Sequence, residues 1–318
     1  MSEPVVSIMV ITYNQEQFIS DAIESFIEQK CNFPLEIVIG DDCSTDNTQN
    51  IIREYSSKYP TLIKPILNPV NLGPLPNAIN VLEHCTGKYI ALCEGDDFWI
   101  DPLKLQKQVD FLEQNNEYVL SFHNVIAVNV IDDKRTRTEL ERELFNKKPE
   151  EIPVEHPTHT SSMLFRNVIG IFPGDFNKII SGDSYLQFIL ARYGKSTFQK
   201  NIYPNVRRRH PQSIWSYKDQ EYKIEQGIYL YERLLEIAIN KNEVKYLNKI
   251  LIKHRIRYVK FLWTNRRKPE SMVTLNKTIK EAWISRLFCY LLAYFLTTMP
   301  LVSPAYKYFK NSARTRLK

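Results

Sequence analysis

Residues 5–14 are VVSIMVITYN, a short β-branched apolar run that ends in the polar loop Thr12-Tyr13-Asn14. Such a run predicts a buried strand. Apolar residues then recur at helical spacing between Phe18 and Ile27, which predicts a helix directly after the loop. A strand, a polar loop and a helix in this order form the first unit of an α/β fold.

The same order recurs further along the chain. Leu35–Ile39 is a second apolar strand stopped by Gly40-Asp41-Asp42, and Ser44-Thr45-Asp46 offers caps for a helix over 48–59. We also expect a strand at 63–67, a helix at 77–85, and a strand at 89–93 directly before Glu94-Gly95-Asp96-Asp97. Strands alternating with helices predict right-handed crossovers and a mostly parallel, Rossmann-like sheet with helices on both faces.

Three of these strand ends carry polar clusters, namely Thr12-Tyr13-Asn14, Asp41-Asp42 and Asp96-Asp97. Ligands of open parallel sheets bind outside the carboxyl ends of the strands, so the fold is expected to bring the clusters together. Adjacent carboxylates repel each other and favour a bound cation, and Mg²⁺ or Mn²⁺ commonly uses one or two carboxylates with phosphate oxygens. An Asp pair alone is a weak signal, because such pairs also cap turns.

The remainder of the chain predicts further elements and a second domain. We expect helices over 101–115 and 184–193, strands over 119–130 and 160–165, and an amphipathic helical pattern over 220–263. The predicted domains are 1–215 with the sheet, 216–280 as a C-terminal helical appendage, and 281–318 as an apolar and basic C-terminal segment.

Charge is distributed unevenly along the 318 residues, whose formal net charge is +6. The positive excess lies in residues 251–318, whose only carboxylates are Glu270 and Glu281, while residues 1–250 are net acidic. Segment 287–302 is almost uncharged, but it is shorter than the ~20 residues that span a bilayer. Two interpretations stand: residues 286–318 contact a membrane surface, or the apolar segment is a buried helix. Nucleic-acid binding is not expected, because the basic tail contains no recognisable module.

Five cysteines without a CxxC pair, and no signal-peptide pattern near Met1, predict reduced thiols and a cytoplasmic location. Contact of the basic tail with lipid would make that location peripheral on the inner face of the cell membrane.

Four segments resemble family 2 glycosyltransferases of the GT-A fold. They are VSIMVITYNQEQFISDAIESFIEQ, LEIVIGDDCSTDNTQNII, NLGPLPNAIN and GKYIALCEGDDFWIDPLKLQKQVDFL, and they cover about residues 4–115. A weaker resemblance continues through SGDSYLQFILARYGK to RRRHPQSIWS. The resemblance implies an enzyme of the bacterial cell-surface polysaccharide type that moves a sugar from a nucleotide-sugar.

The resemblance also implies roles for the donor-site residues. In the nucleotide-binding loop Thr12-Tyr13-Asn14, Tyr13 matches the aromatic that lies against the base, and Asp42 matches the carboxylate that accepts a base N–H. Asp96 matches the carboxylate that lies toward the ribose, and Asp97 the ligand of the Mn²⁺ or Mg²⁺ ion that bridges the diphosphate. A metal ion there stabilises negative charge on the leaving group.

Asp183 stands where the family places its general base, which in an inverting transfer takes the proton of the acceptor hydroxyl. The family more often has Glu-Asp at this point, whereas Gly182 precedes Asp183 here. The alternative is that Asp183 only caps the helix that follows.

His210 matches a histidine close to the metal or diphosphate, and Arg207, Arg208 and Arg209 are expected to stabilise the leaving phosphates. The alternative is a solvated basic loop. His156 and His159 form an HxxH pattern, but Pro157 argues against a helix, so we expect loop histidines. Trp99 and Trp215 are candidates for stacking on sugar, with burial in the core as the commoner outcome.

The sequence therefore predicts an inverting, metal-dependent glycosyltransferase that takes a nucleotide-sugar, with UDP-sugar favoured, and a glycan or polyprenyl-linked acceptor. Two alternatives remain at this point. A nucleotidyltransferase would be expected to have a Gly-rich loop where this chain has Thr12-Tyr13-Asn14. The other alternative is an inactive nucleotide-sugar-binding or membrane scaffold protein. Loss of Asp42, Asp96, Asp97 or Asp183 would have favoured it, but all four are present.

Overall fold

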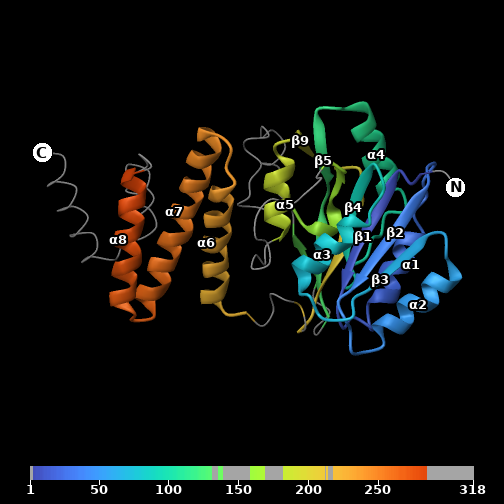
Figure 1. Cartoon of the computed structure of the whole chain (residues 1–318), viewed down its shortest axis with the longest axis horizontal. Helices are drawn as coiled ribbons and strands as arrows, with labels where there is room; N and C mark the ends of the chain where they lie inside the picture. The colour runs from blue at the N-terminus through green and yellow to red at the C-terminus, as the bar shows by residue number, and fades with distance from the viewer. Residues whose placement is uncertain are drawn as a thin grey trace, which may run out of the picture. The chain divides into compact units, whose positions relative to one another are not determined.

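A computed structural model of the chain describes residues 3–130, 135–138, 158–168, 182–211, 213 and 218–284. The chain divides into two compact units, residues 1–217 and residues 218–318. Figure 1 shows a sheet with surrounding helices in the first unit and three long helices in the second. Trp215 and His156, and the segment 285–318 with its predicted membrane contact, lie outside the described residues.

The first unit is built on a seven-stranded sheet in the order β3-β2-β1-β4-β8-β5-β9. Its strands are β1 (Val6–Thr12), β2 (Leu35–Asp41), β3 (Ile63–Leu67), β4 (Tyr89–Glu94), β5 (Tyr118–Phe122), β8 (Leu164–Arg166) and β9 (Lys195–Phe198). Strands β1 to β4 run parallel, with Val6 opposite both Leu35 and Tyr89, and only β8 is antiparallel to its neighbours. The predicted mostly parallel sheet is confirmed.

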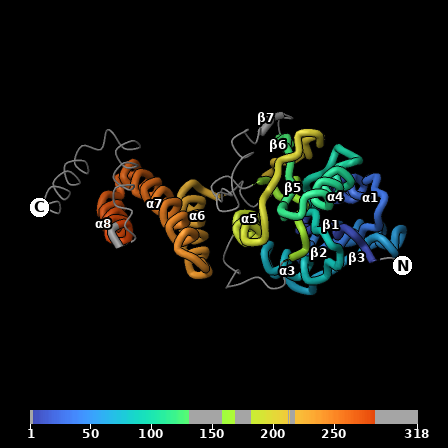
Figure 2. The backbone as a smooth tube through the Cα atoms, turned by 90° about the horizontal axis from the view of Figure 1, so that it is seen from above, coloured from blue at the N-terminus to red at the C-terminus, as the bar shows by residue number. Residues whose placement is uncertain are grey.

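Helices cover both faces of this sheet. They are α1 (Ile19–Ile27), α2 (Thr48–Lys58), α3 (Pro74–Glu83), α4 (Lys104–Gln114) and α5 (Gly182–Leu190). Phe26 of α1 and Val109 of α4 belong to one apolar cluster with β1, and Figure 2 shows α3 on the opposite side of the sheet. Gly40 of β2 permits that contact, because a Cβ atom there would lie 2.2 Å from a methyl group of Val81.

Two predicted strands differ from the structure. The run predicted as one strand over 119–130 is divided between β5 and β6 (Val125–Asn129), and β6 belongs to a second sheet of order β10-β6-β7 with β7 (Arg135–Thr138) and β10 (Asn205–Arg209). The strand predicted over 160–165 begins as a 3-10 turn at Thr160–Ser162, because the Ser162 amide and hydroxyl both donate to the carbonyl of His159.

The second unit consists of α6 (Gln220–Glu236), α7 (Lys241–Thr264) and α8 (Lys268–Ile284). The Asp219 side chain accepts the Tyr222 amide at the start of α6, and the Asn240 side chain accepts the Asn242 and Glu243 amides at the start of α7. These caps separate two helices where the sequence showed one long amphipathic pattern. No helix among the described residues is long and apolar enough to cross a membrane.

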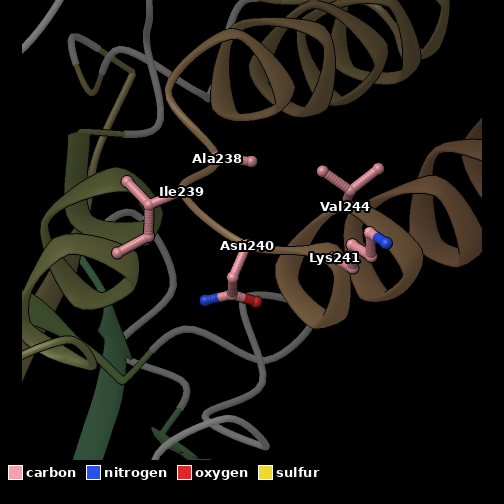
Figure 3. Close-up of a pocket in the computed structure, with 5 residues that line it drawn as sticks. All are labelled: Ala238, Ile239, Asn240, Lys241 and Val244. Atoms are coloured by element: carbon pink, nitrogen blue, oxygen red, sulfur yellow. The ribbon is translucent and has the colours of Figure 1, made fainter.

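Figure 3 shows an open hollow of about 450 Å³ at the turn between α6 and α7. It is lined by Ala238, Ile239, Asn240, Lys241 and Val244. These five residues include no carboxylate, so the hollow does not resemble the predicted donor site.

Candidate active site

The loops that follow β1 and β2 are bonded to each other at the carboxyl edge of the sheet. The Asn14 side-chain oxygen accepts the Thr45 amide at 2.8 Å, and the Asn14 amide donates to the Ser44 hydroxyl at 2.8 Å. Asn14 and Cys43 both have left-handed backbone, with φ of 52° and 63°. These hydrogen bonds join the two loops, and Tyr13 in the first loop is 46% exposed, so a planar ligand can reach its ring.

The two aspartates after β2 already hold backbone and side-chain donors. Asp41 is fully buried and accepts the Ser44 amide at 2.9 Å and the Gln49 side chain at 2.7 Å, so it organises the loop itself. Asp42 accepts the backbone amides of Leu72 and Gly73 at 2.7 and 2.9 Å. Each carboxylate oxygen has a second lone pair, so the hydrogen bond from Asp42 to a nucleobase stays a prediction.

Residues 94–97, here called the acidic turn, place three carboxylates at the end of β4. Asp97 is 3% exposed, and its Oδ1 atom accepts the Arg208 amide at 3.0 Å. The Glu94 carboxylate accepts the Thr160 hydroxyl at 2.6 Å. Asp96 lies 2.9 Å from Nε2 of His210, so the structure brings His210 to the acidic turn, and its predicted pairing with Asp97 at the metal stays a prediction.

Glu94, Asp97 and His159 form a cluster that could hold a divalent ion, because their ligand atoms lie within 4.8 Å of one another. The Nδ1 atom of His159 is 3.8 Å from the Asp97 carboxylate. Carboxylate oxygens with one imidazole nitrogen form a donor set that suits Mn²⁺ or Mg²⁺. The sequence analysis missed Glu94, although it ends the same strand, and it treated His159 as an ordinary loop histidine.

Burial dominates the electrostatics of this cluster. It raises the pKa of Asp97 well above its usual range, and the charges of Asp96 and Glu94 raise it further. Burial also raises the pKa of Glu94 to about 7 and lowers the pKa of His159 to about 3, the latter with help from the charge of Arg207. A cation would relieve this crowding of buried carboxylates, so the residues present fit a divalent ion.

Arg207, Arg208 and Arg209, predicted to stabilise the leaving phosphates with a solvated basic loop as the alternative, form part of strand β10. Strand alternation directs neighbouring side chains to opposite sides. The charge of Arg207 lowers the pKa of Glu94, Asp97 and Asp183. The Arg209 charge reaches His159 on the same side. The Arg208 side chain instead contacts Asp21 and the carbonyl of Asp96. The Arg208 guanidinium is therefore already bonded within the protein.

Asp183 lies in the first turn of α5, where its Oδ1 atom accepts the Ser184 amide at 2.7 Å. Burial raises the pKa of its carboxyl group, and the nearby Arg207 charge opposes that rise. Because Arg207 also acts on Glu94 and Asp97, the general base predicted from the sequence and the acidic turn share one cationic neighbour. A carboxylate whose pKa is raised holds a proton more readily, so Asp183 can accept the proton of an attacking hydroxyl.

Trp99 is buried in the core rather than exposed to a sugar. Its indole N–H donates to the carbonyl of Ser161 at 2.9 Å, and its ring packs edge-on against Phe26 at 4.7 Å. The Lys104 ammonium lies 4.1 Å from the centre of the ring. Trp99 is therefore a core residue two positions after the acidic turn, as the commoner outcome predicted.

Residues 7–170 match the family described as glycosyl transferase family 2, and the chain belongs to this family. It is 49% identical over 123 residues to an uncharacterized protein of Mycobacterium tuberculosis, which covers 39% of this chain and 36% of that protein. It is 35% identical over 141 residues to the dTDP-rhamnosyl transferase RfbG of Shigella flexneri, covering 41% of this chain and 47% of RfbG. The matches thus span about a third to a half of these relatives.

Among solved structures, the chain resembles S. aureus TarS 1-349 in complex with UDP-GlcNAc, with a TM-score of 0.64 and 19% identity. That match covers 95% of this chain and 91% of the TarS chain, and it establishes the fold. The chain is accordingly a member of glycosyl transferase family 2 with a GT-A fold.

Proposed function

We propose that this chain transfers a sugar, with inversion, from a UDP-sugar bound with a divalent metal ion to a glycan or lipid-linked acceptor. The observation that carries the proposal is the cluster of Glu94, Asp97 and His159 at the end of β4, whose ligand atoms lie within 4.8 Å of one another. We assign the donor site to residues 1–215, with residues 216–280 as an appendage.

In the proposed donor site, the exposed ring of Tyr13 stacks on the base and Asp42 accepts a base N–H, with Thr12 and Asn14 shaping the loop. Asp96, held by His210, lies toward the ribose. UDP is favoured because similar TarS structures contain UDP or UDP-GlcNAc. The similar mannosyltransferase PcManGT, solved in complex with GDP-Man and Mn²⁺, makes GDP the main competitor.

Asp97, with Glu94 and His159, would hold Mn²⁺ or Mg²⁺, and His210 lies next to this set through Asp96. The ion, when bound, stabilises negative charge on the departing diphosphate as a Lewis acid. Arg207 and Arg209 add fixed positive charge on the same side of β10, and a guanidinium can pair with two phosphate oxygens.

Asp183 acts as the general base in this proposal. The acceptor hydroxyl oxygen forms the new bond to the anomeric carbon while the bond from that carbon to the diphosphate oxygen breaks. The bonding electrons leave with the diphosphate, and the hydroxyl proton moves to the Asp183 carboxylate. Attack opposite the leaving group inverts the anomeric configuration.

The acceptor side rests on sequence alone. We assign a growing glycan on a polyprenyl carrier in surface polysaccharide synthesis, with residues 286–318 in contact with the membrane surface. If purified protein glycosylates a soluble acceptor equally well with and without anionic vesicles, the membrane contact is wrong.

The donor proposal is tested by titrating UDP, dTDP and GDP into the purified chain by calorimetry, with and without Mn²⁺. We expect metal-dependent binding of UDP that is lost in Asp97→Ala and retained in Asp110→Asn, an exposed residue of α4. Stronger binding of dTDP or GDP would change the donor, and no binding of any nucleotide would overturn the proposal.

A further inference from the structure

Strand β10 is bonded to the end of the acidic turn and to Phe98, which directly follows it. Phe98 and Val206 exchange two backbone hydrogen bonds, of 3.2 and 3.0 Å, in an isolated antiparallel bridge. Two residues further on, the Arg208 amide donates to Oδ1 of Asp97 at 3.0 Å. The backbone of β10 therefore fixes the position of the Asp97 carboxylate directly.

The side chain of Arg208 completes this attachment. Its Nη1 atom donates to the carbonyl of Asp96 at 3.2 Å, and its Nη2 atom is bonded to the carboxylate of Asp21 in α1. Its guanidinium lies 4.5 Å from the centre of the Phe98 ring and 5.2 Å from that of Phe18. The side chain is only 13% exposed, so the protein encloses its guanidinium.

We propose that Arg208 is a positioning residue, which holds the carboxylates of the acidic turn in place for the metal ion without touching the donor. The inference rests on the proposed function and changes the role of Arg208 from the phosphate contact predicted by the sequence. Buried carboxylates that repel one another move apart unless the backbone carrying them is restrained. Arg208 supplies that restraint by joining Asp96, α1 and β10.

The chemistry of the contacts requires arginine. A guanidinium can donate in two directions while it packs against aromatic rings, whereas an ammonium offers a compact point charge and no flat face. Arg208→Lys should therefore fail to restore the clamp, although it retains the charge.

Asp21 allows this role to be separated from a direct phosphate contact. Its side chain is 57% exposed, and it bonds to the side of Arg208 directed to α1. If Arg208 acts through the acidic turn, Asp21→Asn produces a smaller form of the same defect. If Arg208 binds phosphate, loss of Asp21 leaves nucleotide binding unchanged or improves it.

The test compares wild-type protein with Arg208→Ala, Arg208→Lys, Asp21→Asn and the double variant Arg208→Ala/Asp21→Asn. UDP binding is measured by calorimetry over a series of Mn²⁺ concentrations and again without metal, and thermal unfolding is recorded for each protein. Asp110→Asn is the control, because it removes the same charge from another exposed helical aspartate.

We expect the two Arg208 variants to raise the Mn²⁺ concentration for half-maximal UDP binding by about 10- to 100-fold, as residues supporting metal ligands do. UDP binding without metal should stay within about twofold of wild type. Asp21→Asn should shift the Mn²⁺ requirement in the same direction by less, and the double variant should match Arg208→Ala because both changes break one unit.

Three results would overturn the inference. Metal-free UDP binding that falls as far as metal-dependent binding indicates a direct phosphate contact. Full recovery in Arg208→Lys indicates that charge alone is needed, and an unchanged Mn²⁺ requirement in Arg208→Ala shows that the clamp is not needed. A wild-type chain that binds no nucleotide overturns the proposed function, and this inference with it, whereas the first three results leave the proposed function standing.

Discussion

The two units of the chain differ in whether their buried charged side chains are bonded to side chains of opposite charge. In the helical unit, the Arg255 side chain is 4% exposed and is bonded to Glu232 of α6 at 2.6 Å and to Glu281 of α8. In the first unit, Glu94 and Asp97 are buried within reach of each other, and among the described residues no lysine or arginine side chain is bonded to either.

This contrast separates a structural cluster from a functional one. The carboxylates around Arg255 balance its charge, so that cluster is complete within the protein. The acidic turn is incomplete, because the charges of Arg207 and Arg209 act from a distance and His159 is kept neutral by burial. Repulsion between the carboxylates and the loss of their hydration make this cluster unfavourable on its own. A bound cation would offset both costs, which is the physical reason for proposing a metal site there.

The largest effect is expected from Asp97→Asn. Loss of this carboxylate should reduce transferase turnover by at least about 100-fold, since a metal at the leaving group supplies several kcal/mol of transition-state stabilisation. The urea midpoint of the metal-free protein should stay the same or rise, because the variant removes a buried charge that Glu94 and Asp96 repel.

Asp110→Asn, on the exposed side of α4, serves as the control for both measurements. A fall in the urea midpoint of Asp97→Asn without metal would mean that Asp97 is a structural residue like Arg255, and the contrast between the two clusters would be wrong.

The second prediction breaks the complete cluster. Arg255→Ala should lower the free energy of unfolding by about 3 kcal/mol, because Glu232 and Glu281 lose the buried cation that they share, while Glu232 keeps Lys277 at 3.6 Å. Urea unfolding followed by circular dichroism measures this loss, with the exposed Arg257→Ala on the same helix as control. UDP affinity at saturating Mn²⁺ should not change, and a matching loss of affinity would show that this cluster supports the donor site.

The sequence analysis was accurate where periodicity alone determines structure. The first four strands and their helices were predicted. Strands β1, β2 and β4 are largely buried on both faces and are therefore mainly apolar runs, whereas β3, at the edge of the sheet, is partly exposed. The carboxyl-end rule predicted that Asp42, Asp96 and Asp97 lie at one edge of the sheet, and the parallel pairing of β1 with both β2 and β4 places the ends of these strands side by side.

It failed where neighbours, rather than the local sequence, determine structure. Asn205–Arg209 is polar and basic, and it forms a strand only because β6 and Phe98 lie alongside it to accept its hydrogen bonds. The position of His159 could not be predicted either. Its carbonyl accepts a hydrogen bond from Ser162 in a tight turn, and its ring lies 3.8 Å from the Asp97 carboxylate. Strand alternation in β10 would have separated Arg208 from Arg207, had the strand been recognised.

The third prediction concerns another buried charge in the first unit. Burial lowers the pKa of Lys104 from its ordinary value of 10.5 to about 7, while its ammonium donates to Gln108 and lies over Trp99. Between about pH 7 and 10.5 the unfolded chain therefore binds more protons than the folded one, so this contribution to stability increases with pH.

Wild-type protein should gain about 2 kcal/mol over Lys104→Met in free energy of unfolding when the pH is raised from 6 to 9. Urea unfolding at the two pH values gives this difference, and taking it against the variant cancels the groups common to both proteins, including Cys31, Cys93 and Asp101 around the ammonium. Lys58→Met, at an exposed position of α2, should show no such gain. An equal gain for both variants would mean that Lys104 is charged throughout.

The smallest effect tests whether packing in the helical unit is as complete as its charge pairing. Gly227 of α6 faces His254 of α7, and a Cβ atom at position 227 would lie 2.4 Å from the imidazole Nδ1 atom. Gly227→Ala should therefore destabilise the protein by about 1 kcal/mol, although alanine is the better helix former, because the ring must move away from Tyr231. The double variant Gly227→Ala/His254→Ala should show no further cost from the added methyl group beyond that of His254→Ala alone. If Gly227→Ala instead stabilises the protein, the His254 ring can move without cost, and α6 and α7 are not tightly packed at this contact.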